Sequence, residues 1–229
     1  MVICGRDHNH LEAALGRLRI EAPGGELYGM ACDVSAPGEA AAFVSYAVSK
    51  LAIIDRWINN AGTAGRLKRP LWELAPDDID ETCRTNLCGT MLLCAEVVRV
   101  MLRQPFEGTE PSFHIFNMGF SASGVRSSPT AVSHRASKRA VALSTGFLDA
   151  ELKKAGIGAI GVHELSPGLV LTDLLLKDAG LRERMLFNAV AETPETVAAT
   201  LVPRIRTVSG SGGLLRYQPV ILIIDRLLP

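Results

Sequence analysis

The sequence predicts an α/β protein built on a doubly wound parallel sheet, because short apolar runs alternate along it with longer segments of helical spacing. The chain has 229 residues, of which 48% are hydrophobic, which is enough for one sizeable core. Turns of polar or small residues follow the apolar runs, as expected at the carboxyl edge of such a sheet. These observations favour one domain that binds its ligand at that edge.

The individual elements follow from the same alternation. Strands are expected over the short apolar runs at 2–4, 26–34, 53–58, 113–118 and 157–165. Helices are expected over the segments at 8–19, 37–51, 76–103, 131–155 and 193–208. Thr193 suits the N-cap of the last helix, and Pro194 suits its first turn. A domain over 1–208 is expected, followed by a linker and an apolar tail over 209–229, because "SGSGG" opens that segment.

Composition excludes several classes of function. Lysine plus arginine and aspartate plus glutamate both number 24. The sequence therefore has no excess of basic residues, which would be expected of a nucleic-acid-binding protein. The longest wholly apolar runs, such as Val220 to Ile224, are too short to span a bilayer. The five cysteines form no Cys-x-x-Cys pair, which favours reduced thiols and no metal site.

Charged residues follow the first two strands. Arg6 stands where a guanidinium could clamp the 2′-phosphate of NADP, although an exposed charge in a turn is the simpler interpretation. Asp33 could accept a hydrogen bond from an adenine amino group, or could serve as a turn or cap residue. Neither residue decides the function by itself.

Amides and small residues follow the later strands. Asn60, Ala61 and Gly62 of "NNAG" would let a flat ligand approach the backbone closely, or would form an ordinary turn. Asn86 of "TNLCG" lies inside a long predicted helix, where a kink with a held water or a satisfied polar group would explain it. The fourth strand is followed by the hydroxyl-rich "NMGFSASG", and the fifth by Pro167, Gly168 and, shortly after, Thr172.

The stretch "AVSHRASKRAV" at 131–141 raises a separate question. His134 and Lys138 are four residues apart, so they share one face of the predicted helix. The pair is a proton-transfer device, the remnant of one, or a solvated face.

In order and spacing, these motifs resemble the short-chain dehydrogenase/reductase family over essentially the whole chain. The segments "HIFNMGFSASGVRSSPTAV", "GVHELSPGLVLTDLLL" and "FNAVAETPETVAATLVPRIRTV" are similar to its chlorophyll(ide) b reductase branch. The resemblance implies a Rossmann-like sheet and NADPH-dependent reduction of the 7-formyl group of chlorophyll(ide) b to a hydroxymethyl group. It also implies a chloroplast location, and association with a second copy or with a paralogous reductase.

The resemblance implies a cofactor site along the carboxyl edge of the sheet. Arg6 would hold the 2′-phosphate of NADPH, and Asp33 its adenine. The residues that would line the cofactor from the adenosine side to the nicotinamide are Asn60, Ala61, Gly62, Lys138, Pro167, Gly168 and Thr172. The segment 171–191 would form a lid over the substrate, or ordinary core contacts.

The same resemblance implies four catalytic positions. Lys138 would bind the nicotinamide ribose and lower the pKa of the proton donor beside it. Asn86 would position a relay water. A serine would bind the substrate carbonyl, with Ser121 preferred to Ser123. His134 occupies the position of the proton donor.

Two features depart from the family pattern. Met1 falls on the family's second strand, so a central strand and the glycine-rich turn that seats the pyrophosphate are missing, and an N-terminally incomplete chain is expected. The strands at 2–4 and 53–58 would then pair directly or face each other across a gap. His134 replaces the proton-donating tyrosine, and Lys138 disfavours its imidazolium form. An impaired reductase is therefore expected; the alternatives are an inactive pseudoreductase that binds pigment or an active paralogue, and a reductase of another carbonyl.

Overall fold

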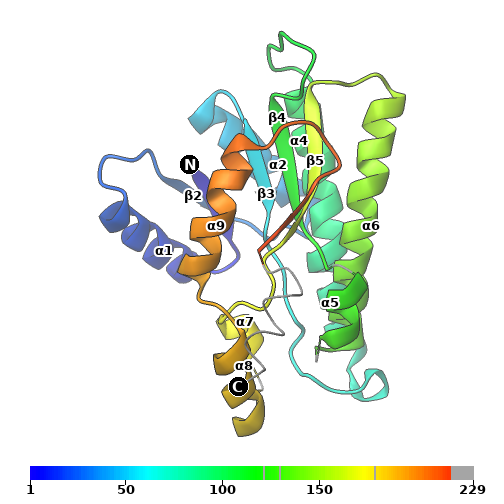
Figure 1. Ribbon diagram of the computed structural model, residues 1–229. Coiled ribbons are helices and arrows are strands. Elements are labelled where there is room, and N and C mark those ends of the chain that lie inside the picture. The colour runs from blue at the N-terminus through cyan, green and yellow to red at the C-terminus, as the bar shows by residue number, and fades with distance from the viewer. Residues whose placement is uncertain (121, 129, 178, 218–229) are drawn as a thin grey trace.

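The computed structural model describes residues 1–120, 122–128, 130–177 and 179–217 (Figure 1). Its strands are β1 (Val2–Gly5), β2 (Tyr28–Ala31), β3 (Arg56–Asn59), β4 (Phe113–Met118), β5 (Ile160–Ser166) and β6 (Leu214–Arg216). Its α-helices are α1 (His8–Glu21), α2 (Pro37–Leu51), α3 (Pro76–Cys83), α4 (Gly89–Met101), α5 (Ala122–Ser127), α6 (Val132–Lys154), α7 (Asp173–Leu176), α8 (Leu181–Val190) and α9 (Pro194–Thr207). A 3₁₀ helix, η1 (Leu71–Glu73), precedes α3, and a π-helical turn, η2 (Arg84–Cys88), joins α3 to α4.

Every strand pair in the described chain is parallel, which confirms the predicted sheet. β1 pairs with β2, whereas β3, β4, β5 and β6 lie side by side in that order. Each connection between parallel neighbours carries at least one helix, as such crossovers require. Within the described residues no ladder joins β1 to β3, so the sheet is divided into two parts. Of the two expectations for these strands, direct pairing and a gap, the structure has the gap.

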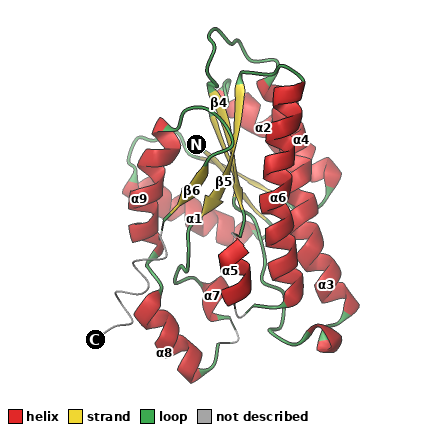
Figure 2. Cartoon of the chain, turned by 45° about the vertical axis from the view of Figure 1, so that its right-hand side comes forward, coloured by secondary structure: helices red, strands yellow, loops and turns green. Residues whose placement is uncertain are grey.

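Helices cover both faces of the sheet (Figures 1 and 2). On one face α2, α4 and α6 enclose the larger core, in which Val97 and Met101 meet Ile115 and Val162. On the other face α1 covers β1 and β2, and α9 packs Leu201 and its neighbours against β4 to β6 in a smaller core. The carboxyl ends of the strands reach the lower end of the molecule in Figure 1, where α5, α7 and α8 lie.

The expected elements occur in the expected order, and their bounds change for local reasons. The helix expected over 76–103 is divided by η2 into α3 and α4. The strand expected over 26–34 ends earlier, because Asp33 forms a turn with Ser35. The strand expected over 53–58 begins later, because the side chain of Gln104 accepts the Ile54 N–H at 2.7 Å. Beyond residue 208, β6 extends the sheet by pairing with β5.

Candidate active site

Three residues predicted from the sequence meet at the carboxyl edge of the sheet. Gly62 lies in the turn after β3, Asn86 in η2 and Lys138 in α6. A Cβ added at Gly62 would lie 3.0 Å from both Asn86 Oδ1 and Lys138 Nζ. A side chain at position 62 would therefore force the Asn86 amide or the Lys138 ammonium to shift.

Lys138 is a buried cation at the centre of this cluster. Only 7% of its surface is exposed, and its Nζ donates to the Met118 carbonyl at the end of β4, 3.1 Å away. Burial lowers the pKa of Lys138 from 10.5 to about 8. An ammonium carries three donors, so Lys138 can also bind hydroxyl oxygens of a ligand. Because His134 is buried as well, the solvated-face interpretation of this pair is wrong.

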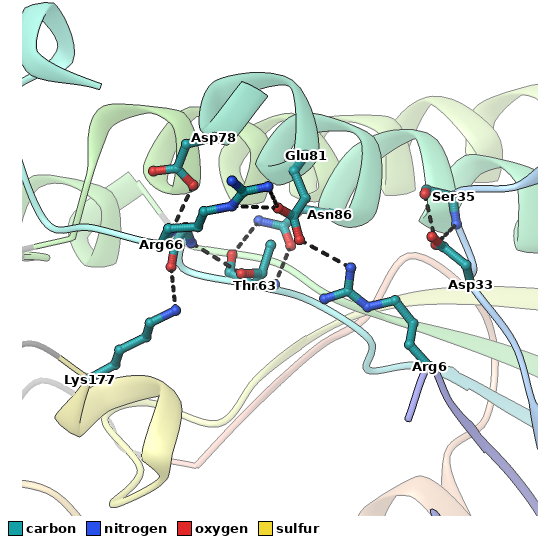
Figure 3. Close-up of polar contacts among 10 residues, drawn as sticks. Arg6, Asp33, Ser35, Thr63, Arg66, Asp78, Glu81, Asn86 and Lys177 are labelled. Atoms are coloured by element: carbon teal, nitrogen blue, oxygen red, sulfur yellow. Dashed lines mark hydrogen bonds and ion pairs between the residues drawn. The ribbon is translucent and has the colours of Figure 1, made fainter. Parts of the chain in front are cut away.

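Asn86 links the turn after β3 to α6, and Figure 3 shows its contacts with Thr63 in that turn. Its Oδ1 accepts the Thr63 N–H at 2.8 Å, and its Nδ2 donates to the Thr63 carbonyl and to Ser137 Oγ, both at 2.9 Å. The residue lies in the π-helical turn, a local widening that recurs at functional sites. Both sequence interpretations therefore hold in part, since the helix is distorted and the amide is satisfied by protein groups. The relay water stays a prediction.

His134 is held as a neutral imidazole. Its Nδ1 lies 2.8 Å from Thr130 Oγ1, and its ring meets Phe120 edge-on with the centroids 5.2 Å apart. Burial, followed by the charges of Lys138 and Lys68, lowers the pKa of His134 from 6.5 to about 4. At pH 7 only about 0.1% of such an imidazole is protonated. The side chain at the expected proton-donor position is therefore a poor general acid.

The segment after β4 lies against the same helix. Phe120 donates its N–H to the Lys138 carbonyl at 3.2 Å. Ser121, the preferred residue for carbonyl binding, lies outside the described residues. Ser123 lies in α5, and its side chain is also outside the description.

Arg6 and Asp33 lie beyond β1 and β2, on the other side of the site (Figure 3). Arg6 Nη1 pairs with Glu81 Oε1 at 3.1 Å, and Arg66 Nη2 pairs with the second oxygen of Glu81 at 3.0 Å. Asp33 Oδ1 accepts the N–H and the hydroxyl of Ser35 at 2.9 and 2.7 Å. Burial opposes ionisation of Asp33, but these hydrogen bonds and the charge of Arg6 outweigh it and lower its pKa. Asp33 therefore serves as a turn residue, and its contact with an adenine stays a prediction.

The segment after β5 turns sharply toward α7. Gly168 adopts φ 77°, a conformation that favours glycine, directly after Pro167. Thr172 caps α7, because its Oγ1 accepts the Leu175 N–H at 3.3 Å. Their contacts with a nicotinamide stay predictions, as do those of Asn60 and Ala61, which are exposed beyond β3.

Two lysines that sequence analysis missed connect α7 and α8 to the turn after β3. Lys68 donates to the Leu175 carbonyl at 2.9 Å and lies 5.8 Å from the centre of the Phe187 ring. Lys177 donates to the Gly65 carbonyl at 3.0 Å. Phe187 is only 3% exposed, which supports the core-contact interpretation of this residue. No signal in the sequence links these residues, because more than a hundred positions separate the partners.

Sequence analysis also missed a pair of hydrogen-bonded, buried asparagine side chains near the carboxyl ends of β3 and β4, here called the amide ladder. Asn59 and Asn117 are partners in the β3–β4 register, and Asn59 Nδ2 donates to Asn117 Oδ1 at 2.8 Å. Asn117 Nδ2 donates to Thr145 Oγ1 at 3.1 Å, which links the ladder to α6. The available signal was an asparagine near the end of each of two apolar strands.

The residues of the candidate site fit the two ends of a nicotinamide dinucleotide better than the pyrophosphate at its centre. Lys138, beside Gly62, suits ribose hydroxyls, and Arg6 suits a phosphate. A pyrophosphate is commonly seated on a helix N-terminus. At α1 that place is taken by the carboxylate of Asp7, which accepts the His10 N–H at 2.8 Å. Within the described residues, no glycine-rich turn replaces it.

Comparison with known proteins places this geometry in a family. A family model described as "short chain dehydrogenase" matches residues 1–179. Chlorophyll(ide) b reductase NOL, chloroplastic, of Arabidopsis thaliana is 38% identical over 215 residues, which cover 93% of this chain and 60% of that protein. The protein named "Probable chlorophyll(ide) b reductase NYC1, chloroplastic" of Oryza sativa subsp. japonica is 41% identical over 192 residues, which cover 84% of this chain and 36% of that protein.

A solved structure shares the fold closely. A short chain dehydrogenase/reductase from Burkholderia phymatum, in complex with NAD, superposes with a TM-score of 0.78 at 26% identity and covers 99% of this chain and 82% of its own. In the described part of this chain, no helix is both long enough and apolar enough to cross a membrane. From the matched family model and the parallel sheet, we conclude that the chain belongs to the short-chain dehydrogenase family.

Proposed function

We propose that this chain reduces a carbonyl group, and that its substrate is the 7-formyl group of chlorophyll(ide) b, which becomes a hydroxymethyl group. The observation that carries the proposal is the cluster at the carboxyl edge of the sheet in which the buried side chains of Asn86 and Lys138 lie against the exposed Gly62. The names of the plant relatives support the substrate and a chloroplast location. The proposed cofactor is NADPH, which supplies the hydride when it is bound.

In this proposal the chain's own residues hold the reactants and the charge. Lys138 is mostly protonated at neutral pH, so it can bind ribose hydroxyls and favour negative charge that develops on the carbonyl oxygen. Asn86 fixes the distance between the turn after β3 and α6. Arg6 is the proposed partner of the 2′-phosphate, in competition with Glu81.

Proton donation is the weak step. The reduced carbonyl oxygen must gain a proton, and His134 is almost wholly neutral at pH 7 because its pKa is about 4. This observation favours a second candidate function, an inactive pseudoreductase that binds pigment or an active relative. Exposed Leu143 and Phe147 on α6, at 46% and 66%, support association of this helix with another chain.

The test places a proton-donating tyrosine at position 134 in place of the neutral histidine. We expect His134→Tyr to raise formation of the 7-hydroxymethyl product from chlorophyllide b and NADPH by about 10²-fold, since a positioned general acid contributes about that much. The product is measured by chromatography, and NADPH binding by the fluorescence of its nicotinamide. His10→Tyr, on the exposed surface of α1, is the matched control and should leave the rate unchanged.

The outcomes separate the candidate functions. Cofactor and pigment binding without product in either form would identify a pseudoreductase. Product from the parent chain at a rate that His134→Tyr does not change would show that position 134 does not deliver the proton.

A further inference from the structure

Two hydroxyl side chains connect His134 to the surface of the molecule. The Nδ1 atom of His134 lies 2.8 Å from Thr130 Oγ1, and that oxygen lies 2.8 Å from Ser128 Oγ. Thr130 is buried, with 9% of its surface exposed, whereas Ser128, directly after α5, is half-buried. The three side chains form a continuous hydrogen-bonded path from the surface beside α5 to the face of α6 that carries Lys138. We call Ser128 and Thr130 the hydroxyl path.

The contacts of the hydroxyl path favour one direction for its hydrogen bonds. Ser128 Oγ accepts the Thr130 N–H at 3.4 Å, which leaves the hydrogen of Ser128 to be donated to Thr130 Oγ1. The hydroxyl hydrogen of Thr130 is then donated to Nδ1 of His134. A neutral imidazole has one acceptor nitrogen and one donor nitrogen, so this arrangement puts the ring proton on Nε2. Within the described residues, no side chain forms a hydrogen bond with that nitrogen.

The surroundings of His134 favour a ring that passes a proton rather than one that stores it. The described charges that act on the ring are those of Lys138 on α6 and Lys68 in the segment after β3, and both are positive. Together with burial, which has the larger effect, they hold the pKa of His134 to about 4. Imidazolium is therefore scarce at neutral pH. A neutral imidazole can still transmit a proton, because it can lose the Nε2 proton while it gains another at Nδ1.

We propose that His134 delivers a proton to the reduced carbonyl as a neutral relay, and that the hydroxyl path supplies this relay from water. The inference rests on the proposed reductase activity. Once the carbonyl carbon has been reduced, its oxygen is negatively charged and needs one proton. The Nε2–H bond of His134 breaks as the O–H bond of the product forms. At the same time the Nδ1–H bond forms as the O–H bond of Thr130 breaks.

Water replaces the proton that the product takes. Thr130 regains a proton from Ser128, and Ser128 regains one from water, which is left as hydroxide. After the product leaves, Nε2 takes a proton from water and Nδ1 returns its own along the hydroxyl path. All three side chains end unchanged, and one proton in total has come from the solvent. In this scheme His134 is the catalytic residue, whereas Thr130 and Ser128 are positioning residues that act through it.

The first test is made on the free chain and needs no activity. Nitrogen NMR of the ¹⁵N-labelled protein at neutral pH distinguishes a protonated ring nitrogen from an unprotonated one. We expect the proton on Nε2 of His134, and we expect the Nδ1 resonance to shift in Thr130→Val, which removes the hydroxyl and keeps the shape. Thr130→Ser should restore the parent resonance.

Thr82→Val is the matched control for loss of a buried threonine hydroxyl. Thr82 is fully buried in α3, and its Oγ1 has no hydrogen-bond partner within the described residues. This substitution should therefore leave the ring resonances of His134 unchanged, as well as the rate of product formation.

The second test measures product formation from chlorophyllide b and NADPH. Thr130→Val should lower kcat by about 10²-fold and leave KM unchanged, since proton transfer by a positioned group contributes about that much. Thr130→Ser should recover most of the rate, because it keeps the hydroxyl. Between about pH 6 and pH 7 the rate should stay constant, because the neutral ring is the active form. A protonated imidazole acting as donor would instead lose about tenfold over that interval.

Four results would overturn the inference. The first is a proton on Nδ1 of His134 in the parent chain, since Thr130 would then accept a proton rather than supply it. The second is a tenfold fall in rate between pH 6 and pH 7, and the third is product formation that Thr130→Val leaves unchanged. The fourth is product from His134→Tyr but none from the parent chain, which would remove the relay and leave the reductase fold competent. Absence of product from both chains would contradict the reductase activity itself, and this inference with it.

Discussion

The part of the sheet built on β3 to β6 is packed far more completely than the part built on β1 and β2. In β4 the residues from Phe113 to Asn117 are all buried, whereas every residue of β1 is only half-buried. β4 has a strand on each side and a helical layer on each face. β1 and β2 form a two-stranded ribbon, which has little stability by itself.

The candidate site takes residues from both parts of the sheet. Lys138 and Asn86 lie on the well-packed side. Hydrogen bonds fix Asn86 to Ser137 of α6 and to the turn after β3, and Lys138 to the Met118 carbonyl at the end of β4. Arg6 lies on the weakly packed side and holds only a surface ion pair with Glu81, with 51% and 31% of the two side chains exposed. The chain therefore fixes the residues proposed to act at the reacting carbonyl more firmly than those proposed to hold the far end of the cofactor.

The largest expected effect is the difference in stability between two matched isoleucine truncations. Ile115 in β4 is fully buried, so Ile115→Ala should lower the free energy of unfolding by about 3–4 kcal/mol. Ile3 in β1 is half-buried, so Ile3→Ala should cost about 1 kcal/mol. Urea denaturation measures both values. Equal losses would show that the two parts of the sheet are packed equally well.

The histidines are found in or beside both parts of the sheet, and the buried ones predict that stability depends on pH. His8 and His10 are exposed on α1, whereas His114, His134 and His163 are buried on the β3 to β6 side. His114 Nδ1 and His163 Nε2 lie 2.9 Å apart, and His114 Nε2 lies 3.0 Å from the Pro111 carbonyl. This geometry assigns a neutral ring to each, with His114 Nε2 and His163 Nε2 as the donors. Burial first, then the charge of Arg56, lowers the pKa of His114 to about 4.

Acidification should therefore destabilise the well-packed region. The folded-state pKa values of His114 and His134 lie below the unfolded value of about 6.5, so the unfolded chain binds more protons between the two values. The stability that the neutral rings contribute is complete above about pH 6.5 and is lost as the pH falls toward 4. Each ring should contribute a loss of about 2 kcal/mol by pH 5.

Urea denaturation at pH 7.5 and at pH 5 measures this loss. The double variant His8→Gln and His10→Gln should keep all of it, because both side chains are exposed. If that variant no longer loses stability in acid, the assignment of the pH response to the buried rings is wrong.

The sequence predicts the well-packed region better than the contacts between regions. Strand and helix order follows from apolar periodicity, and Lys138 and Asn86 lie in helices that this periodicity predicts. A kink at Asn86 is one of the two interpretations that the sequence offers. Its π-helical form could not be predicted, because Asn86 contacts the turn after β3 and Ser137 of α6, which are distant in sequence. Local propensity contains no information about either partner.

Contacts over long sequence separation were the main omission. The pairing of Arg6 with Glu81 joins residues 75 positions apart, and the contact of Lys68 with Leu175 joins residues 107 apart. β6 was missed because its three residues follow a glycine-rich stretch, and their strand conformation depends on pairing with β5.

The smallest expected effect on stability is at Arg6, where the weakly packed region meets the proposed cofactor. Arg6→Ala should change the free energy of unfolding by no more than about 1 kcal/mol, because the pair with Glu81 is largely exposed. If Arg6 holds the 2′-phosphate, the same change should weaken binding of 2′,5′-ADP by about tenfold and leave binding of 5′-ADP unchanged. Calorimetric titration measures both affinities.

Arg66→Ala is the matched control, because Arg66 pairs with the same carboxylate from the turn after β3 rather than from β1. Loss of that pair should cost about the same small stability and should leave the preference for 2′,5′-ADP intact. Equal weakening of the two nucleotides by Arg6→Ala would mean that Arg6 supplies only general positive charge. Equal effects of both arginine variants would mean that Glu81, rather than Arg6, governs binding at this edge, because each variant changes the charge balance around that carboxylate in the same way.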